Sequence, residues 1–164
     1  MNANEIFAQR LKNARIMKGL SMDELVSAMG NAISKMTISK YEKCRLSPNS
    51  SIIISLAKAL NQPVDYFFRP YTLQIDSIKF RKTKSNLSVK QENAIKEQIS
   101  DLIERYINIE EICNSSVKSD FLVSGLITSE SQVKQAAVEL RNKWEIGNDG
   151  IVNVIDLLEE HGIK

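Results

Sequence analysis

The first 70 residues carry short stripes of apolar side chains at helical spacing, and each stripe is bounded by residues that end or start a helix. One stripe runs from Ile6 to Met17, and a second, shorter stripe ends at Gly30. Between them, Ser21 and Glu24 have the three-residue spacing of a capping box, which marks the start of the second helix. Short helices bury their apolar sides only against one another, so we expect a compact helical bundle.

Three further helical patterns complete this predicted bundle. Ser34 can cap a third helix that runs to about Lys43, with Ile38 and Tyr41 on its packing side. A fourth helix follows a Ser-Pro-Asn turn, and a last short turn of helix ends the region. The inward positions of the fourth helix are Ile52, Ile53, Leu56, Ala57 and Leu60. We therefore predict a mainly α fold that begins with a five-helix domain over residues 1–70.

Charge is unevenly distributed along the chain, although the net charge is only +2. Residues 1–70 hold ten basic and five acidic side chains, residues 71–120 hold eight of each, and residues 121–164 hold four basic and seven acidic. A basic N-terminal part is what attraction to phosphates requires, although many other domains are mildly basic.

The remaining bulk features exclude several classes of protein. No run approaches the ~18 apolar residues of a membrane-spanning helix, and the N-terminus lacks a signal-peptide pattern. The two cysteines form neither a disulfide framework nor a metal-binding pair, because they lie 69 residues apart. We expect a cytoplasmic protein with no membrane partner.

The segments SMDELVSAMG, TISKYEK and ISLAKALNQPVDYFF, with the dipeptide SP before the last of them, resemble the Xre, or phage-repressor-like, family of DNA-binding domains. The resemblance covers the whole first domain and includes two short helices joined by a small turn, the helix-turn-helix arrangement. It implies that the partner is a double-stranded DNA operator. It also implies that the third helix is a recognition helix, whose N-terminal end enters the major groove.

The resemblance assigns roles to individual side chains. The positions at which the family reaches base edges are Lys35, Met36, Thr37 and Lys40. The positions suited to phosphate contacts are Ser21, Ser34, Ser39, Lys43 and Arg45. A lysine can donate to the O6 and N7 atoms of guanine, and a methionine or threonine methyl group can contact the methyl group of thymine. We expect Glu42 to tie this helix to the scaffold. The alternative is an ordinary surface helix that carries lysines.

Three positions depart from the family pattern. Asn31 and Ala32 lengthen the turn by two residues, and Met22 stands where the family often has a glutamine that binds phosphate. Cys44 replaces the usual glycine after the recognition helix. If this position has a positive φ, a cysteine there costs about 1 kcal/mol. We expect its thiol to be buried and inert, not a redox switch.

Residues 71–87 are predicted to be a strand-like basic linker. Tyr71, Leu73 and Ile75 alternate with polar residues, as in a β-strand, and the alternation resumes at Ile78 after a slip that indicates a bulge or a bend. The basic run of residues 79–84 either is a solvated linker or makes an auxiliary phosphate contact.

Residues 88–164 are predicted to be a smaller helical region. A long helix from Ser88 carries a heptad-like stripe, whose first members are Ile95, Ile99, Leu102 and Tyr106. This stripe is either the core of a second helical domain, which we favour, or a dimer seam. A homodimer is expected in any case, because helix-turn-helix proteins usually bind paired half-sites. Ser129 and Gln132 are spaced to cap a further helix.

A second resemblance concerns residues 64–88 and 136–164, which are similar to the lead-in of the ImmA/IrrE metallopeptidase family fused behind an Xre domain. That family carries an HExxH zinc helix further on, whereas this sequence has one histidine and no HExxH. We therefore expect no catalytic residue, metal site, cofactor or enzymatic activity in this chain.

Three functional hypotheses follow from these patterns. The leading one is a sequence-specific, repressor-like transcriptional regulator. The second is an N-terminal piece of a DNA-binding regulator whose longer form is a zinc metallopeptidase. The third is the antitoxin of a toxin–antitoxin pair, in which the second region holds a toxin or another regulatory protein.

Overall fold

The computed structural model describes residues 2–70, 87–117, 119 and 127–163. Over these ranges the chain is mainly helical, which confirms the predicted fold class. The chain divides into two compact units, residues 1–106 and 107–164. The strand-like linker was predicted at residues 71–87, and residues 71–86 of it lie outside the described residues.

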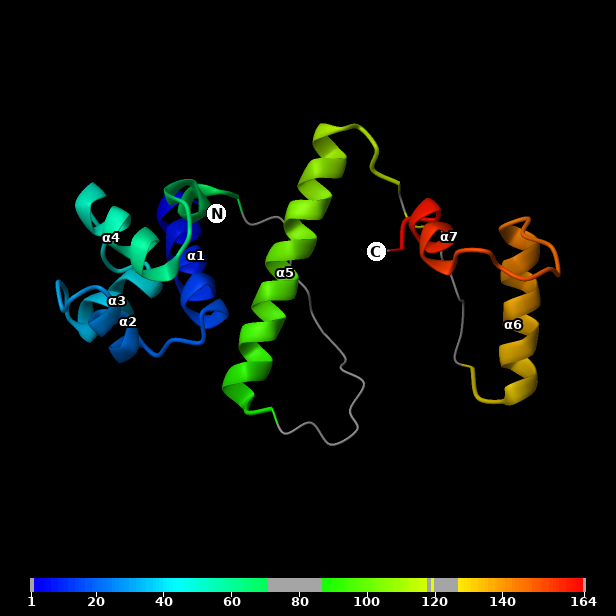
Figure 1. Cartoon of the computed structure of the whole chain (residues 1–164), viewed down its shortest axis with the longest axis horizontal. Helices are drawn as coiled ribbons and strands as arrows, with labels where there is room; N and C mark the ends of the chain where they lie inside the picture. Colours follow the sequence, from blue (N-terminus) through cyan, green and yellow to red (C-terminus); the bar gives the residue numbers. More distant parts are fainter. Residues whose placement is uncertain (1, 71–86, 118, 120–126, 164) are drawn as a thin grey trace. The chain divides into compact units, whose positions relative to one another are not determined.

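The first unit contains the predicted five-helix arrangement (Figure 1). Its elements are α1 (Ala3–Met17), α2 (Met22–Ala28), α3 (Lys35–Glu42), α4 (Ser50–Leu60) and the 3-10 helix η1 (Val64–Phe68). The helix α5 (Val89–Ile112) begins in this unit and continues past its boundary, and it lies beside α1 (Figure 1).

Side chains of polar residues set the beginnings of these helices. Asn2, Ser21, Ser34 and Asn49 each accept a hydrogen bond from a backbone N–H in the first turn that follows. The capping box predicted at Ser21 is present, because Glu24 Oε2 also accepts from the Ser21 backbone N–H at 2.6 Å. The caps predicted from Ser21 and Ser34 are therefore confirmed.

One hydrophobic core joins the first four helices to η1. Its buried members are Phe7, Leu11, Ala14, Met17, Leu25, Ile38, Tyr41, Leu56, Ala57, Leu60, Tyr66 and Phe67. Phe7 lies at an aromatic cluster, with its ring centroid 5.7 Å from that of Phe67 and 6.4 Å from that of Tyr41. Ile6, which the sequence stripe included, is only half-buried. The core therefore fixes α3 against α1, because Ile38 and Tyr41 belong to it.

The second unit contains α6 (Glu130–Lys143) and α7 (Val154–Glu160) in addition to the end of α5. The predicted cap of α6 is confirmed, because Ser129 and Gln132 form a capping box. Trp144 is buried and stacks on His161, with ring centroids 4.1 Å apart and planes at 5°. It is the one buried hydrophobic side chain among the described residues of this unit.

Among the helices that the structure describes, none is long and apolar enough to cross a membrane.

Candidate nucleic-acid interface

The turn between α2 and α3 is built from two successive residues with positive φ. Gly30 has φ +68° and Asn31 has φ +60°. The backbone N–H groups of these residues donate to Ser27 O and Val26 O, both at 2.9 Å, and so close the end of α2. Asparagine tolerates this left-handed conformation better than most residues, which accounts for its place in the longer turn.

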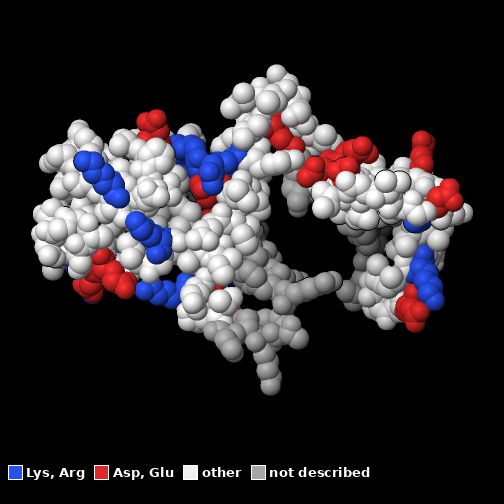
Figure 2. All heavy atoms as spheres, in the orientation of Figure 1, with Lys and Arg blue, Asp and Glu red and all other residues white. Residues whose placement is uncertain are grey.

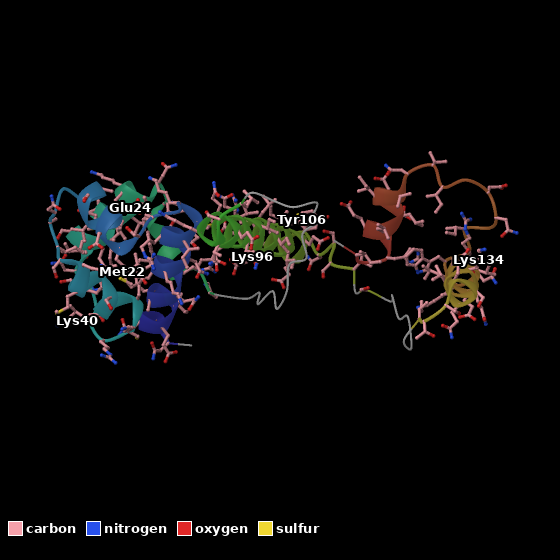
Figure 3. The ribbon with its side chains drawn as sticks, turned by 90° about the horizontal axis from the view of Figure 1, so that it is seen from below. Met22, Glu24, Lys40, Lys96, Tyr106 and Lys134 are labelled. Carbon is pink, nitrogen blue, oxygen red and sulfur yellow. The ribbon has the colours of Figure 1, made fainter. Side chains whose placement is uncertain are left out.

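The two sides of α3 differ sharply in exposure. Ile38 is fully buried and Tyr41 is 5% exposed, which confirms the packing side predicted for this helix. Met36 is 68% exposed, and Lys35 and Lys40 are also exposed. Figure 3 places Lys40 at an edge of the first unit that is remote from α5. The helix therefore presents long side chains to solvent from a firmly packed base.

Glu42 ties α3 to α1 through Arg15, as the sequence predicted for Glu42 without its partner. Arg15 Nε donates to Glu42 Oε1 at 2.6 Å, and Arg15 Nη2 donates to Glu42 Oε2 at 2.9 Å. The third guanidinium nitrogen, Nη1, donates to Leu20 O at 2.9 Å. A two-point arginine–carboxylate pair fixes direction as well as distance, so α3 is held in one orientation on α1.

Two of the four predicted base-reading residues, Lys35 and Thr37, contact other side chains of the protein. Lys35 pairs with Asp23 of α2, with Nζ 2.6 Å from Oδ2, and both side chains are well exposed. Thr37 is half-buried, and its hydroxyl lies 2.9 Å from that of Ser34. No sequence pattern indicated the Lys35–Asp23 pair, because the two residues belong to different helices.

The five predicted phosphate-binding residues lie at helix ends and along α3. Ser21 and Ser34 use their hydroxyl oxygens to cap α2 and α3. The Ser21 hydroxyl can still donate its proton, whereas the Ser34 hydroxyl also forms a hydrogen bond with that of Thr37. Ser39 is half-buried within α3, whereas Lys43 and Arg45 are exposed after its last turn. The exposed cations at Lys43 and Arg45 are therefore at the opposite end of the helix from Lys35.

Cys44 occupies the left-handed position that ends α3, with φ +55°. Its N–H donates to Tyr41 O at 3.0 Å, and the Arg45 N–H donates to Lys40 O at 2.8 Å. This pair of bonds is the Schellman motif, in which the left-handed position is usually glycine. The condition for backbone strain at Cys44 is thus met. The expectation of a buried thiol is wrong, because Cys44 is exposed.

Met22 stands at the position where the family often has a phosphate-binding glutamine, and it packs partly buried against the hydrophobic core.

On the face of the first unit drawn in Figure 2, lysine and arginine side chains are spread out, with acidic groups between them. Among the residues that the structure describes, no group of three histidine, cysteine or acidic side chains is placed to hold a metal ion.

Comparison with known proteins gives one match. Residues 11–67 match the family model described as helix-turn-helix, and this range runs from within α1 to η1. A search of the curated proteins and a search of the solved structures each returned no significant match. Residues 11–67 are thus an Xre-like helix-turn-helix domain, which supports a DNA-binding regulator.

Proposed function

We propose that this Xre-like domain makes the protein a sequence-specific, repressor-like transcriptional regulator that binds its operator as a homodimer. The observation that carries the proposal is the division of α3. Ile38 and Tyr41 are locked in the core, while Met36 and Lys40 project into solvent. A helix of this kind can enter the major groove without disturbing the fold that supports it.

The start and middle of α3 supply the proposed base contacts. Lys40 can donate to guanine, and Met36 offers an exposed apolar side chain to a thymine methyl group. Lys35 can leave Asp23 for an acceptor on DNA at little cost, because exposed ion pairs contribute only ~0–1 kcal/mol. Asp23 then repels any phosphate that approaches too closely, which favours one docking position.

The phosphate contacts proposed for Lys43 and Arg45 come from the other end of the same helix. Both side chains are exposed, and the Schellman motif at Cys44 directs the backbone that carries Arg45. Contacts to phosphates position a domain on DNA and carry no sequence information of their own. The two ends of α3 therefore have separate tasks, one in reading bases and one in anchoring.

The dimer contact is proposed for the outer face of α5. Leu102 is 62% exposed and Ile109 is 60% exposed, on the opposite side of the helix from the buried Glu104. Ile95 and Ile99 lie half-buried on the same stripe, and Tyr106 is exposed on it. Steps of three and four residues match the seam of a helix pair. A second copy of the chain is the proposed partner, because paired operator half-sites require two recognition helices.

The direct test selects bound DNA from random sequence and then compares Lys40→Ala with Lys58→Ala. Lys58 is an exposed lysine of α4, so its variant has the same net charge but an intact α3. We expect Lys40→Ala to cost about 1–3 kcal/mol on the selected site and to relax discrimination at one base pair. Lys58→Ala should retain the selected consensus. An unchanged consensus and affinity in Lys40→Ala would show that α3 does not read the groove as proposed.

A second candidate function, the antitoxin, draws support from the second unit. Val133, Val138 and Ile155 are each more than half exposed there, and Val152 is fully exposed. Residues 107–164 also contain ten acidic and five basic side chains. An acidic surface with exposed apolar groups suits a basic protein partner. Copurification of a stoichiometric partner that the second unit alone retains would favour this candidate.

The resemblance to ImmA/IrrE proteins stays a prediction, since the family match ends at Phe67. Comparing the intact mass with the length of the encoding reading frame tests whether a peptidase region follows.

A further inference from the structure

Arg10 is a charged residue at the centre of the contact between α1 and α5. It is 1% exposed, and its Nη1 and Nη2 donate to the two oxygens of Glu104 at 2.6 and 2.7 Å. Its Nε donates to Arg69 O at 3.0 Å, and Nη2 also donates to the carbonyl oxygen of Pro70. Burial opposes the charge of Arg10, yet Glu104 raises the pKa of the guanidinium above its ordinary value. The pair is therefore ionised and held at several points.

Arg69 extends this contact into a network. Its Nη2 donates to Asp101 Oδ1 at 2.6 Å and lies 3.3 Å from Glu104 Oε2. The guanidinium carbons of Arg10 and Arg69 lie 5.3 and 5.4 Å from the ring centroid of Tyr66, within reach of cation–π attraction. We call Arg10, Arg69, Asp101 and Glu104 the charge clasp.

Two further contacts hold α5 along its length. Gln98 Nε2 donates to Met17 O, at the end of α1, at 3.0 Å. Near the start of α5, Lys90 Nζ lies 3.1 Å from Glu24 Oε2 of α2, in an exposed ion pair that adds little to stability. The attachment points from Lys90 to Glu104 span about 21 Å of helix at 1.5 Å per residue. Separate attachments over such a length fix the direction of a helix and not only its position.

The same helix α1 therefore carries both of the arginines that fix its neighbours. Arg15 holds α3 through Glu42, and Arg10 holds α5 through Glu104. These two pairs, with the core that joins α1 to α3, form a continuous connection from the recognition helix to α5. The outer face of α5 therefore has a defined orientation relative to α3.

We propose that the charge clasp sets the spacing at which two recognition helices meet DNA, and so selects operators by the separation of their half-sites. This inference rests on the proposed function, in which the outer face of α5 pairs two copies. Charged pairs suit such a role, because their hydrogen bonds specify geometry that apolar packing would leave adjustable. Arg10, Arg69, Asp101 and Glu104 are positioning residues in this scheme and do not touch DNA.

The experiment measures binding to three DNAs that carry the selected half-site: one half-site alone, two at the selected spacing, and two with about five extra base pairs, half a helical turn. The proteins are the full chain, Glu104→Ala, and Glu111→Ala as the control. Glu111 is an exposed acidic residue further along α5, so the two variants change charge equally. Sedimentation gives the oligomeric state, and circular dichroism checks the fold.

We expect the unaltered chain and Glu111→Ala to favour the selected spacing by ~100-fold or more, because simultaneous engagement of two sites gains avidity of that order and is lost when geometry forbids it. In Glu104→Ala this preference should fall at least tenfold, while the dimer and the affinity for one half-site stay unchanged. If Glu104→Ala does not fold, Arg69→Ala replaces it in the test, because it removes the clasp contacts to Asp101 and Glu104 from a partly exposed position and leaves the buried Arg10–Glu104 pair in place.

Three results would overturn the inference. They are a spacing preference that survives in the clasp variants, an absence of any preference in the unaltered chain, and a clasp variant that is monomeric. In the last case the clasp would act on assembly instead of spacing. Failure of the proposed function looks different, since the unaltered chain would then select no half-site at all.

Discussion

Replacing Cys44 by glycine should stabilise the first unit. The residue has φ +55°, a conformation that places the side chain of an L-amino acid too close to its own backbone. Two other helices of the chain have glycine at the equivalent position. These glycines are Gly19 after α1 and Gly30 after α2, with φ +65° and +68°. Cys44 therefore carries a strain that these two helix ends avoid.

The magnitude follows from two opposing contributions. Relieving the left-handed strain contributes about 1–2 kcal/mol. The greater conformational entropy of glycine in the unfolded chain offsets about 0.4–1 kcal/mol of this gain. The exposed Cys44 side chain contributes little packing that could be lost. We therefore expect a net gain of about 0.5–1 kcal/mol in the free energy of unfolding, or a few degrees in Tm.

Urea denaturation followed by far-ultraviolet circular dichroism measures this change. The fluorescence of Trp144, the single tryptophan, reports the second unit and should not shift. Two variants serve as controls. Cys44→Ala keeps the strain and should stay within about 0.5 kcal/mol of the unaltered chain. Gly19→Ala should lose stability, because it places a side chain at a positive φ. An added Cβ there meets no atom within 4 Å, so the change isolates the effect of backbone strain. Equal stabilities of Cys44→Gly and Cys44→Ala would refute the reasoning.

Three other predictions concern the proposed recognition helix α3 and the neighbouring helix α2. Replacing Lys43 or Arg45 by alanine should weaken binding to selected and random DNA alike. It should also lower the slope of log affinity against log salt concentration by about one in magnitude. An effect on the selected site alone would contradict this prediction. Glu42→Ala should cost about 1.5–3 kcal/mol in urea denaturation, because the largely buried guanidinium of Arg15 loses its carboxylate; an unchanged midpoint would show that the pair contributes nothing. The Ser21 backbone and hydroxyl groups, then Lys90, lower the pKa of Glu24 from 4.5 to about 2. Its contribution to stability should thus be complete above pH 4.5 and lost as pH falls toward 2, and an NMR titration midpoint near 4.5 would contradict it.

Local features of the fold could be predicted from the sequence because short-range physics determines them. The caps at Ser21 and Ser34 depend on residues three positions away, and the packing of Ile38 and Tyr41 follows from helical period. The positive φ at Cys44 could be predicted only for the case in which α3 ends in a Schellman motif, because that motif requires it. The domain boundaries and the DNA-contacting residues stay predictions.

The contact between α1 and α5 could not be predicted in this way. Hydrophobic periodicity identifies the side of a helix that packs on an apolar partner, but α5 contacts α1 through the polar residues Gln98 and Glu104. Arg10, likewise, is a charged residue on the buried side of α1. Its carboxylate partner is distant in sequence, so neither spacing nor composition indicates the pair. The Lys35–Asp23 pair was missed because its two residues lie on different helices.

The sequence separation within the charge clasp also bears on the order in which the protein folds. Arg10 and Glu104 are 94 residues apart, whereas the contacts of α1 with α3 and η1 close shorter loops. Closing the longer loop costs more entropy, so α5 should dock after the first four helices have formed. During synthesis at ~5–20 residues per second, Glu104 is made about 2–7 s after Phe67. Arg10 is thus hydrated in the nascent chain, and clasp substitutions should accelerate unfolding while leaving the folding rate nearly unchanged.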